Sequence, residues 1–323
     1  MVNILVAQCH SKEKSNRLTA IHWVTEFIGI GSTHFILYYA GILSSIIYCI
    51  SDPESDICQA ARVANSGLMQ LVKNTTVPFE LLPLIHTLTS ELLSEHVSTR
   101  VACLHWIDML HEKDSSDMNR HIGELLPSLL KCVSDSADEV VLVNLQVLAR
   151  ISLTDDSQFH RVMNSLVQLF FEDRPLLETR GSLVVRKLCS LLDASSIYLT
   201  LADILLDSHK QDLEFASLLV QSLNLILLTA PELASLRISL QRSITRQDGK
   251  GTVAADVSSF SRLFRCWTHN PVATFSLCLL AQAYDLSARL ILRFAEVDVT
   301  VGFLMQVDKL VQLLESPICE ITT

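Results

Sequence analysis

The sequence predicts an all-α protein: an α-solenoid of HEAT/armadillo-like antiparallel helix pairs with a C-terminal helical block. Only 9 glycines and 8 prolines occur in 323 residues, too few turn residues for a β fold with many short strands. Hydrophobic residues make up 49% of the chain and charged residues 19%, so there is ample apolar side chain to bury. A short junction motif also recurs at nearly the interval of a two-helix repeat.

Each junction consists of an apolar residue, a small or acidic residue and an acidic residue, and is expected to separate two helices. Successive acidic members lie 43, 40, 38 and 34 residues apart. HEAT and armadillo repeats have periods of about 40 to 47 residues, so the spacing predicts one helix pair for each interval. The junctions are Ile50-Ser51-Asp52, Leu93-Ser94-Glu95, Val133-Ser134-Asp135, Phe171-Glu172-Asp173 and, more loosely, Leu205-Leu206-Asp207.

Helix starts have their own sequence marks. The first helix of a pair is amphipathic, as in the apolar series at positions 101, 104, 107 and 110. The sequence Glu-Leu-Leu-Pro occurs at 80–83 and again at 124–127. Because proline fits the first turn of a helix, both copies predict helix beginnings near Pro83 and Pro127.

The chain divides into three predicted parts. Residues 1–246 form the HEAT-like helical repeat array, and residues 247–257, with Gly249 and Gly251, form a flexible linker. Residues 258–323 form a C-terminal helical scaffold and assembly region. Neither end of the array supplies a polar cap, and the apolar start at residues 1–6 suggests a piece of a longer solenoid, truncated at both ends.

No pattern in the sequence supports an enzyme. The segment Gly29-Ile30-Gly31-Ser32-Thr33 lacks the lysine and the following glycine of a phosphate-binding loop, and a helix-helix turn explains it. Cys266 and His269 form at most half a metal site, so we expect no catalytic residues, no metal and no cofactor. Acidic pairs at 138–139 and 155–156 are expected at helix N-termini, where they favour the helix dipole.

Charge and cysteine content limit the environment and the partners. The formal net charge of −10 argues against a nonspecific grip on nucleic acid. The nine cysteines, irregularly spaced and mostly within apolar runs, indicate reduced thiols in a cytoplasmic protein. The stretch from Ile28 to Ile50 is apolar but is interrupted at residues 29–34, which favours a buried helix pair over a membrane span.

Two surface patterns have more than one interpretation. Arg237, Arg242, Arg246 and Lys250 could meet anionic lipid, although a solvated face leading into a loop is the favoured interpretation. Aromatic residues and arginines gather around Asn270-Pro271, a composition found both at interface hot spots and in helix-helix cores. The core interpretation is slightly favoured. These residues are Phe260, Phe264, Trp267, Phe275, Arg262, Arg265 and His269.

Long segments resemble one known family. They are FRCWTHNPVATFSLCLLAQAYDLSARLIL at 264–292 and DVTVGFLMQVDKLVQLLESPI at 298–318, together with RLTAIHWVTEFIGIG and YAGILSSIIYCISD within 17–73. They are similar to the vacuole-morphology HEAT-repeat scaffolds of the PIKfyve phosphoinositide kinase complex, the ArPIKfyve family, in its middle and C-terminal region. The resemblance extends over nearly the whole chain.

The resemblance implies a non-catalytic scaffold that associates with itself. It would assemble a phosphatidylinositol-3-phosphate 5-kinase with a Sac-type phosphoinositide 5-phosphatase, and so regulate phosphatidylinositol 3,5-bisphosphate. The implied location is peripheral, on endosomal and vacuolar or lysosomal membranes through the complex. The expected partner-binding residues are Phe264, Trp267, His269, Asn270, Pro271, Asp308 and Lys309.

A second function uses the same fold. A HEAT-type transport or trafficking adaptor would bind cargo through its concave face, because a fold does not specify its partners. That function predicts a line of exposed acidic or aromatic residues along successive second helices. An enzyme is the most distant alternative.

Overall fold

The computed structural model describes residues 2–30, 38–77, 79–208, 212–245, 253–296 and 300–315. Every regular element in these ranges is a helix, which confirms the predicted all-α fold. The chain forms two compact units, residues 1–159 and 160–323. Their boundary lies within α10 (Asp156–Glu172).

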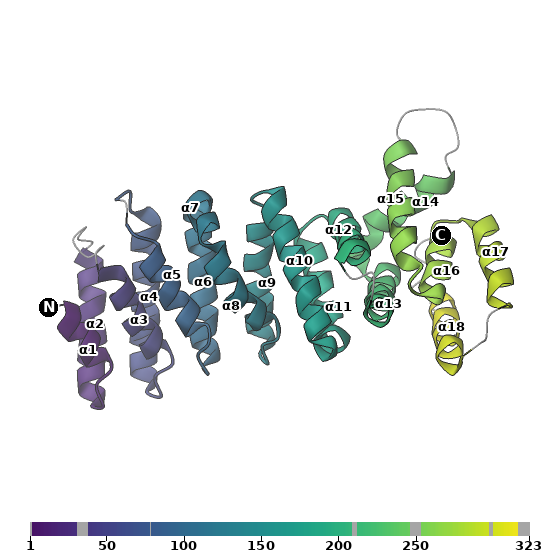
Figure 1. Cartoon of the computed structure of the whole chain (residues 1–323). Coiled ribbons are helices and arrows are strands. Elements are labelled where there is room, and N and C mark those ends of the chain that lie inside the picture. Colours follow the sequence, from purple (N-terminus) through teal and green to yellow (C-terminus); the bar gives the residue numbers. More distant parts are fainter. Residues whose placement is uncertain are drawn as a thin grey trace. The chain divides into compact units, whose positions relative to one another are not determined.

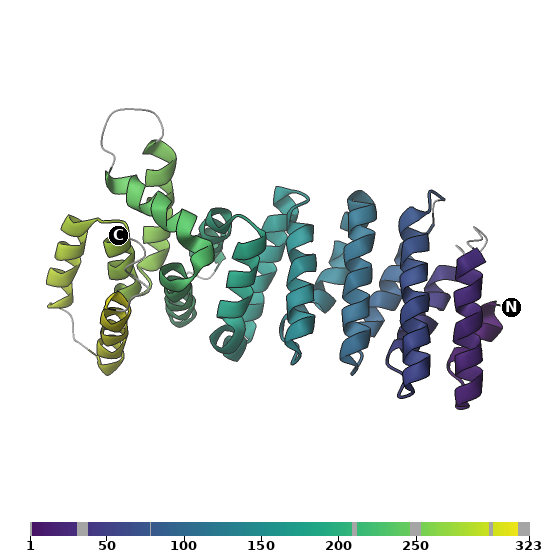
Figure 2. The ribbon, with the colours of Figure 1, turned by 180° about the vertical axis from the view of Figure 1, so that it is seen from behind.

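The helices of the first unit lie in two layers, and each helix contacts the next one in its own layer (Figures 1 and 2). One layer contains α1 (Val2–Cys9), α3 (Tyr39–Ile50), α5 (Leu82–Glu91) and α8 (Ile122–Val133). The other contains α2 (Lys14–Ile30), α4 (Ser55–Asn74), α6 (Val97–Lys113) and α9 (Asp138–Ser152), and the short α7 (Ser115–Arg120) leads from α6 to α8. This two-layer stacking is that of a HEAT/armadillo-like α-solenoid, because each pair buries its apolar faces against its neighbours.

The predicted junctions coincide with helix ends. Helix α3 ends at Ile50, α8 at Val133 and α10 at Glu172, and in each case the next helix begins within a few residues. At 155–156, the predicted capping is confirmed because the Asp155 carboxylate accepts a hydrogen bond of 2.8 Å from the Gln158 amide. Such side-chain acceptors satisfy amides that have no partner inside the helix.

Two junction aspartates also join neighbouring repeats. Asp52 accepts hydrogen bonds of 2.7 and 3.1 Å from Arg17 on α2, and Asp135 accepts a bond of 2.9 Å from Arg100 on α6. The sequence separation is 35 residues in both pairs. Each aspartate additionally accepts a hydrogen bond from the backbone amide two residues further on. One carboxylate thus shapes the turn and ties it to the preceding helix pair.

Two tryptophans repeat another contact. Trp106 Nε1 donates to Asn65 Oδ1 at 2.7 Å across 41 residues, and Trp267 Nε1 donates to Asn224 Oδ1 at 3.1 Å across 43 residues. Both indoles are fully buried. The same donor and acceptor types at one repeat separation agree with the period that the junctions predict.

The two Glu-Leu-Leu-Pro segments differ in their place within a helix. Pro83 is the second residue of α5, as predicted. Pro127 lies inside α8, which begins at Ile122, so the prediction of a helix start at Pro127 is wrong by more than one turn. The prolyl nitrogen cannot donate to the carbonyl four residues earlier, and the helix tolerates this loss because the neighbouring turns are anchored by buried leucines.

The second unit continues from α10 with seven α-helices after α11 and one short 3₁₀ helix in the described ranges. Helix α11 (Arg174–Leu191) packs on α12 (Ala194–Ser208) and α13 (Leu213–Thr229), and α15 (Val253–Trp267) packs on α12 and α14 (Ala234–Thr245). The 3₁₀ helix η2 (Pro231–Leu233) connects α13 to α14. Helix α16 (Pro271–Leu280) contacts α13, α17 (Tyr284–Phe294) and α18 (Val301–Leu314).

The predicted linker falls mainly on residues outside the described ranges. Residues 247–252 are among these, and residues 253–257 form the beginning of α15. The helix therefore starts earlier than the predicted boundary at Ser258. The division into 1–246, 247–257 and 258–323 stays a prediction.

The basic segment is not a solvated face at its start. Arg237 is buried, and its guanidinium donates to the carbonyls of Leu227 and Ala230 at 3.0 and 2.7 Å. These carbonyls belong to the C-terminal end of α13, where acceptors lack helical partners and a cation is favoured. Arg242 is exposed on α14, while Arg246 and Lys250 lie outside the described residues.

The cysteines of the described ranges are free thiols, as predicted, and most are buried. No single helix among the described residues is long and apolar enough to cross a membrane, although the bent pair Leu213–Thr229 and Pro231–Ser243 passes by length and composition. The interrupted stretch around residue 30 contributes α3, which has only 12 residues.

Candidate functional site

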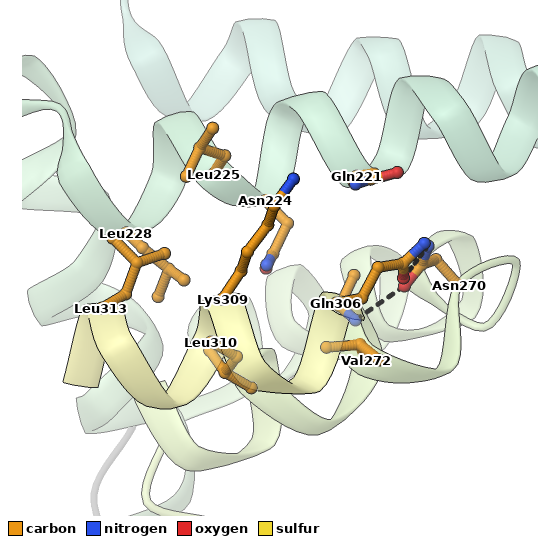
Figure 3. A pocket seen from close by; sticks show the side chains of 11 residues that line it. Gln221, Asn224, Leu225, Leu228, Asn270, Val272, Gln306, Lys309, Leu310 and Leu313 are labelled. Atoms are coloured by element: carbon orange, nitrogen blue, oxygen red, sulfur yellow. Dashed lines mark hydrogen bonds between the residues drawn. The ribbon is translucent and has the colours of Figure 1, made fainter. Parts of the chain in front are cut away.

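A pocket of about 120 Å³ lies between α13, α16 and α18 in the second unit (Figure 3). Its wall combines aliphatic side chains with several amide side chains and one lysine. Two of the predicted partner-binding residues, Asn270 and Lys309, line it. The lining residues are Gln221, Asn224, Leu225, Leu228, Asn270, Val272, Ala273, Gln306, Lys309, Leu310 and Leu313.

Asn270 holds the three helices of the pocket together. Its Oδ1 accepts a hydrogen bond of 2.9 Å from the Ala273 amide and so caps α16. Its Nδ2 donates to Ser217 on α13 and to Gln306 Oε1 on α18, both at 3.2 Å. Asparagine is a preferred residue at a helix N-cap because its side chain satisfies an amide that the helix leaves unpaired. Asn270 is buried, so it positions the pocket wall.

Asn224 is fixed from below by two donors. Trp267 Nε1 donates to its Oδ1 at 3.1 Å, and the Ser276 hydroxyl donates to the same oxygen at 2.8 Å. An indole N–H can only donate, so this bond fixes the amide with its oxygen toward Trp267. Trp267 itself is fully buried beside Tyr198, with ring centroids 6.3 Å apart. The structure therefore places Trp267 in the core beneath the pocket.

The aromatic cluster predicted around residue 267 is split among three places. Phe264 packs on Phe260 within α15, with centroids 5.8 Å apart, while Phe275 packs on Phe294 at 6.3 Å. Arg262 pairs with Asp203 on α12. These contacts follow the core interpretation more closely than the exposed hot spot.

The other predicted residues lie near the ends of helices. His269 Nδ1 lies 2.7 Å from the carbonyl oxygen of Cys266, and Pro271 is the exposed first residue of α16. Asp308 and Lys309 are exposed on α18, and Asp308 accepts a hydrogen bond of 2.7 Å from Gln312. Lys309 extends across the pocket toward α13 (Figure 3). As contacts with a partner, all seven residues stay a prediction.

Several pocket residues were not singled out from the sequence. Asn224 and Gln221 are polar positions within the apolar sequence SLLVQSLNLILL of α13, and Gln306 lies within the apolar α18. A polar residue on the buried side of an apolar helix is a signal that could have drawn attention to Asn224. The pairing of α13 with α18 has no local sequence signal.

The chemistry of the site does not resemble that of a catalytic centre. Burial raises the pKa of the Cys266 thiol to about 12 and that of Cys278 to about 11, so neither is a thiolate at neutral pH. In the described part of the chain, no group of three or more His, Cys, Asp or Glu residues could hold a metal ion. The pocket offers instead a small apolar recess with hydrogen-bonding groups at its wall.

A second surface feature adjoins the pocket. Large apolar side chains of α17 and α18 are exposed, with Leu292 at 68% and Val301 at 75% of their full accessibility. We refer to these residues together as the C-terminal apolar surface. They are Tyr284, Ile291, Leu292, Val301, Leu304, Met305 and Val311.

Two known families match the chain. Residues 174–321 match a family of partner-binding regions described as the C-terminal part of Vacuolar protein 14, and this match includes every residue of the pocket. We refer to it as the Vacuolar protein 14 C-terminal binding family. Residues 1–142 match "EF3 N-terminal HEAT repeat", which agrees with the two helix layers of the first unit. The HEAT match thus ends within α9, and the C-terminal match begins at α11.

Curated relatives extend the similarity over nearly the whole chain. Protein VAC14 homolog of Arabidopsis thaliana is 41% identical over 98% of this chain, and its Schizosaccharomyces pombe counterpart is 32% identical over 93%. Vacuole morphology and inheritance protein 14 of Saccharomyces cerevisiae is 28% identical over 98%. The chain spans 42%, 37% and 35% of the lengths of these relatives.

Among solved structures, a designed armadillo repeat protein is similar with a TM-score of 0.31 and 14% identity, covering 83% of this chain and all of that one. At this TM-score the similarity supports no conclusion about function.

Proposed function

Because the chain belongs to the family of VAC14 homologues, we propose that it is a non-catalytic scaffold of a phosphoinositide kinase and phosphatase complex. In this proposal it assembles a phosphatidylinositol-3-phosphate 5-kinase with a Sac-type phosphoinositide 5-phosphatase. The complex then controls both the synthesis and the turnover of phosphatidylinositol 3,5-bisphosphate. The single observation that carries the proposal is the match of residues 174–321 to the Vacuolar protein 14 C-terminal binding family.

Phosphatase binding belongs to the second unit. The match begins at the first residue of α11 and includes α12 to α18, with the pocket among α13, α16 and α18. A cluster of exposed apolar residues and a partly apolar pocket on one unit are features of protein-binding surfaces. Binding to the Sac-type phosphatase is therefore proposed for this unit.

Kinase binding is proposed for the helix layers of the first unit. Stacked helix pairs present an extended surface on which each repeat contributes a few side chains. The HEAT match over residues 1–142 supports this arrangement. The kinase would thus contact a different part of the chain from the phosphatase.

Self-association is proposed for the C-terminal apolar surface. Soluble monomers seldom expose large contiguous apolar patches, and such patches mark interaction sites. Seven large apolar side chains on α17 and α18 are between 44% and 75% exposed. A second copy of the chain that covers them would remove this surface from water.

The proposed location follows from the partners. A cytoplasmic scaffold that holds two lipid-modifying enzymes lies peripherally on the membrane that carries their lipid, here endosomal and vacuolar or lysosomal membranes. The name of the Saccharomyces cerevisiae relative, which refers to vacuole morphology, supports a vacuolar association. In this proposal the enzymes provide the membrane contact.

Reconstitution with purified proteins tests the function. We expect the full chain to co-elute with the Sac-type phosphatase and, separately, with the kinase on size exclusion, and to bring both enzymes into one complex when all three are mixed. The kinase and phosphatase alone serve as the control and are expected to elute apart. Failure of the chain to bind either enzyme would contradict the proposal and leave the trafficking adaptor as the function to examine.

A further inference from the structure

We propose that the pocket between α13, α16 and α18 receives one apolar side chain of an acidic segment of the phosphatase, and that Lys309 binds the carboxylate next to that side chain. This inference rests on the proposed function and adds the site and the chemistry of the recognised segment. It is argued from the hydrogen-bonding groups that the pocket leaves unused, from its size and from its charge.

The acceptor oxygens of the pocket wall are already occupied. Asn224 Oδ1 accepts two hydrogen bonds, Asn270 Oδ1 accepts the Ala273 amide, and Gln306 Oε1 accepts from Asn270 Nδ2. What remains of Asn224 and Gln306 is the amide nitrogen of each, and neither nitrogen donates to a residue in the described ranges. The wall therefore presents donors, and these require a ligand that supplies acceptors.

Lys309 adds the third donor and the charge. It is the only charged residue among the eleven lining residues, and its ammonium makes no hydrogen bond or ion pair within the described ranges. Figure 3 shows its side chain reaching across the pocket toward α13. A carboxylate or a row of backbone carbonyls complements three donors, whereas a basic segment does not.

The size and lining of the pocket indicate what accompanies the carboxylate. A volume of about 120 Å³ is close to that of a cavity of about 150 Å³ that accommodates benzene, so it suits one aliphatic or aromatic side chain. Leu225, Leu228 and Leu313 form the apolar part of the wall, and Leu225 is half exposed. An apolar anchor flanked by charge-assisted hydrogen bonds is the usual composition of an energetically important contact.

The phosphatase is favoured over a second copy of the chain as the source of this segment. All lining residues lie within the part that matches the Vacuolar protein 14 C-terminal binding family. A second copy finds a larger purely apolar area on α17 and α18, where association needs no unpaired acceptor. The two surfaces can therefore be separated by substitution.

Binding of the purified phosphatase to full-chain variants tests the proposal. Lys309→Glu reverses the charge, and Leu225→Glu places a carboxylate at the apolar wall. Both side chains are exposed, so the fold is expected to persist, as checked by circular dichroism and the urea midpoint. Each variant is expected to weaken phosphatase affinity at least about tenfold, while Lys309→Arg retains most of it.

Matched controls use the first unit. Lys131→Glu on α8 and Leu153→Glu after α9 make the same chemical changes at exposed positions, and are expected to leave phosphatase affinity unchanged. The affinity of the unsubstituted chain is also expected to fall with added salt more steeply than that of Lys309→Gln, because the ion pair is screened.

The outcomes separate this proposal from the proposed function. If the unsubstituted chain binds the phosphatase and the folded pocket variants bind it equally well, the pocket assignment is overturned and the scaffold function stands. If the unsubstituted chain does not bind, both are overturned. If the pocket variants lower the oligomeric mass of the chain alone while phosphatase binding is kept, a second copy is the occupant and the proposal is wrong.

Discussion

A single carboxylate at a repeat junction links two neighbouring helix pairs. Asp135 binds Arg100, whose guanidinium also donates to the carbonyl of Ser94 at 2.7 Å, and both side chains are about nine-tenths buried. Asp52 and Arg17 repeat the arrangement. Because a buried charge depends on its partner, removing one member of such a pair leaves the other uncompensated.

Asp135→Ala is therefore expected to lower the free energy of unfolding by about 3 kcal/mol or more, since it leaves Arg100 buried without its carboxylate. Urea unfolding followed by circular dichroism measures the change. Arg120→Ala breaks the exposed pair with Asp117 and serves as the control, with little effect expected. An equal loss in both variants would show that burial of the Arg100 pair adds nothing.

His111 gives the protein a pH-dependent stability. It is buried on α6, with Nε2 3.3 Å from the Thr154 hydroxyl, and Asn119, Arg150 and Asp108 surround it. Burial lowers the pKa of His111 below its ordinary value of about 6.5. The unfolded chain therefore takes up this proton at a higher pH than the folded chain, and stability decreases as the pH falls through 6.5.

His111→Gln is expected to lose less stability than the unsubstituted protein between neutral pH and pH values below 6.5, because glutamine does not titrate. Thermal unfolding at several pH values measures this difference. The other histidines titrate in both proteins and so cancel in the comparison. Parallel stability curves for the two proteins would contradict the role assigned to His111.

At the scale of an element, the position of a residue within its helix decides its effect. Pro83 and Pro127 occupy the same four-residue sequence, yet Pro83 lies in the first turn of α5 and Pro127 lies within α8. A first-turn amide has no helical acceptor, whereas an amide at position 127 would donate to the carbonyl of Gly123. Local sequence alone gives both prolines the same meaning, and the extent of each helix separates them.

Pro127→Ala is expected to raise the free energy of unfolding by about 1–3 kcal/mol, because it restores a hydrogen bond within α8 and removes the clash of the prolyl ring. Pro83→Ala is the matched control and is expected to change stability by less than about 1 kcal/mol, toward lower stability. Urea midpoints of the two variants give the comparison. Equal effects would mean that α8 adapts around Pro127 without cost.

At the scale of the whole molecule, the exposed apolar residues lie on the last two helices. Leu292→Asp and Leu304→Asp place charges on the C-terminal apolar surface, where the native leucines are 68% and 56% exposed. If this surface mediates self-association, each variant is expected to have a lower oligomeric mass, because burial of a carboxylate in an apolar interface is unfavourable. Light scattering coupled to size exclusion measures the mass.

Leu153→Asp is the control for this prediction. Leu153 is 69% exposed and lies after α9 in the first unit, so the same substitution there is expected to leave the mass unchanged. If the variants in α17 and α18 keep the mass of the unsubstituted protein, self-association uses another surface.

The sequence by itself determined the helical class, the repeat period and most helix ends. These depend on apolar periodicity, scarce turn residues and capping side chains, all of which act over a few neighbouring residues. The contacts of Trp106 and Trp267 with asparagines about forty residues earlier then agree with that period. The similarity of residues 264–292 to a known family also came from the sequence alone.

Only the tertiary structure decided which polar residues meet. Arg237 looked like part of a solvated basic segment, but it satisfies the last carbonyls of α13. Trp267 lies in the core, and Asn224 and Gln306 from helices far apart in the sequence come together at one pocket. The packing of α13, α16 and α18 sets these contacts, and no short-range pattern encodes it because each repeat is completed by residues of its neighbours.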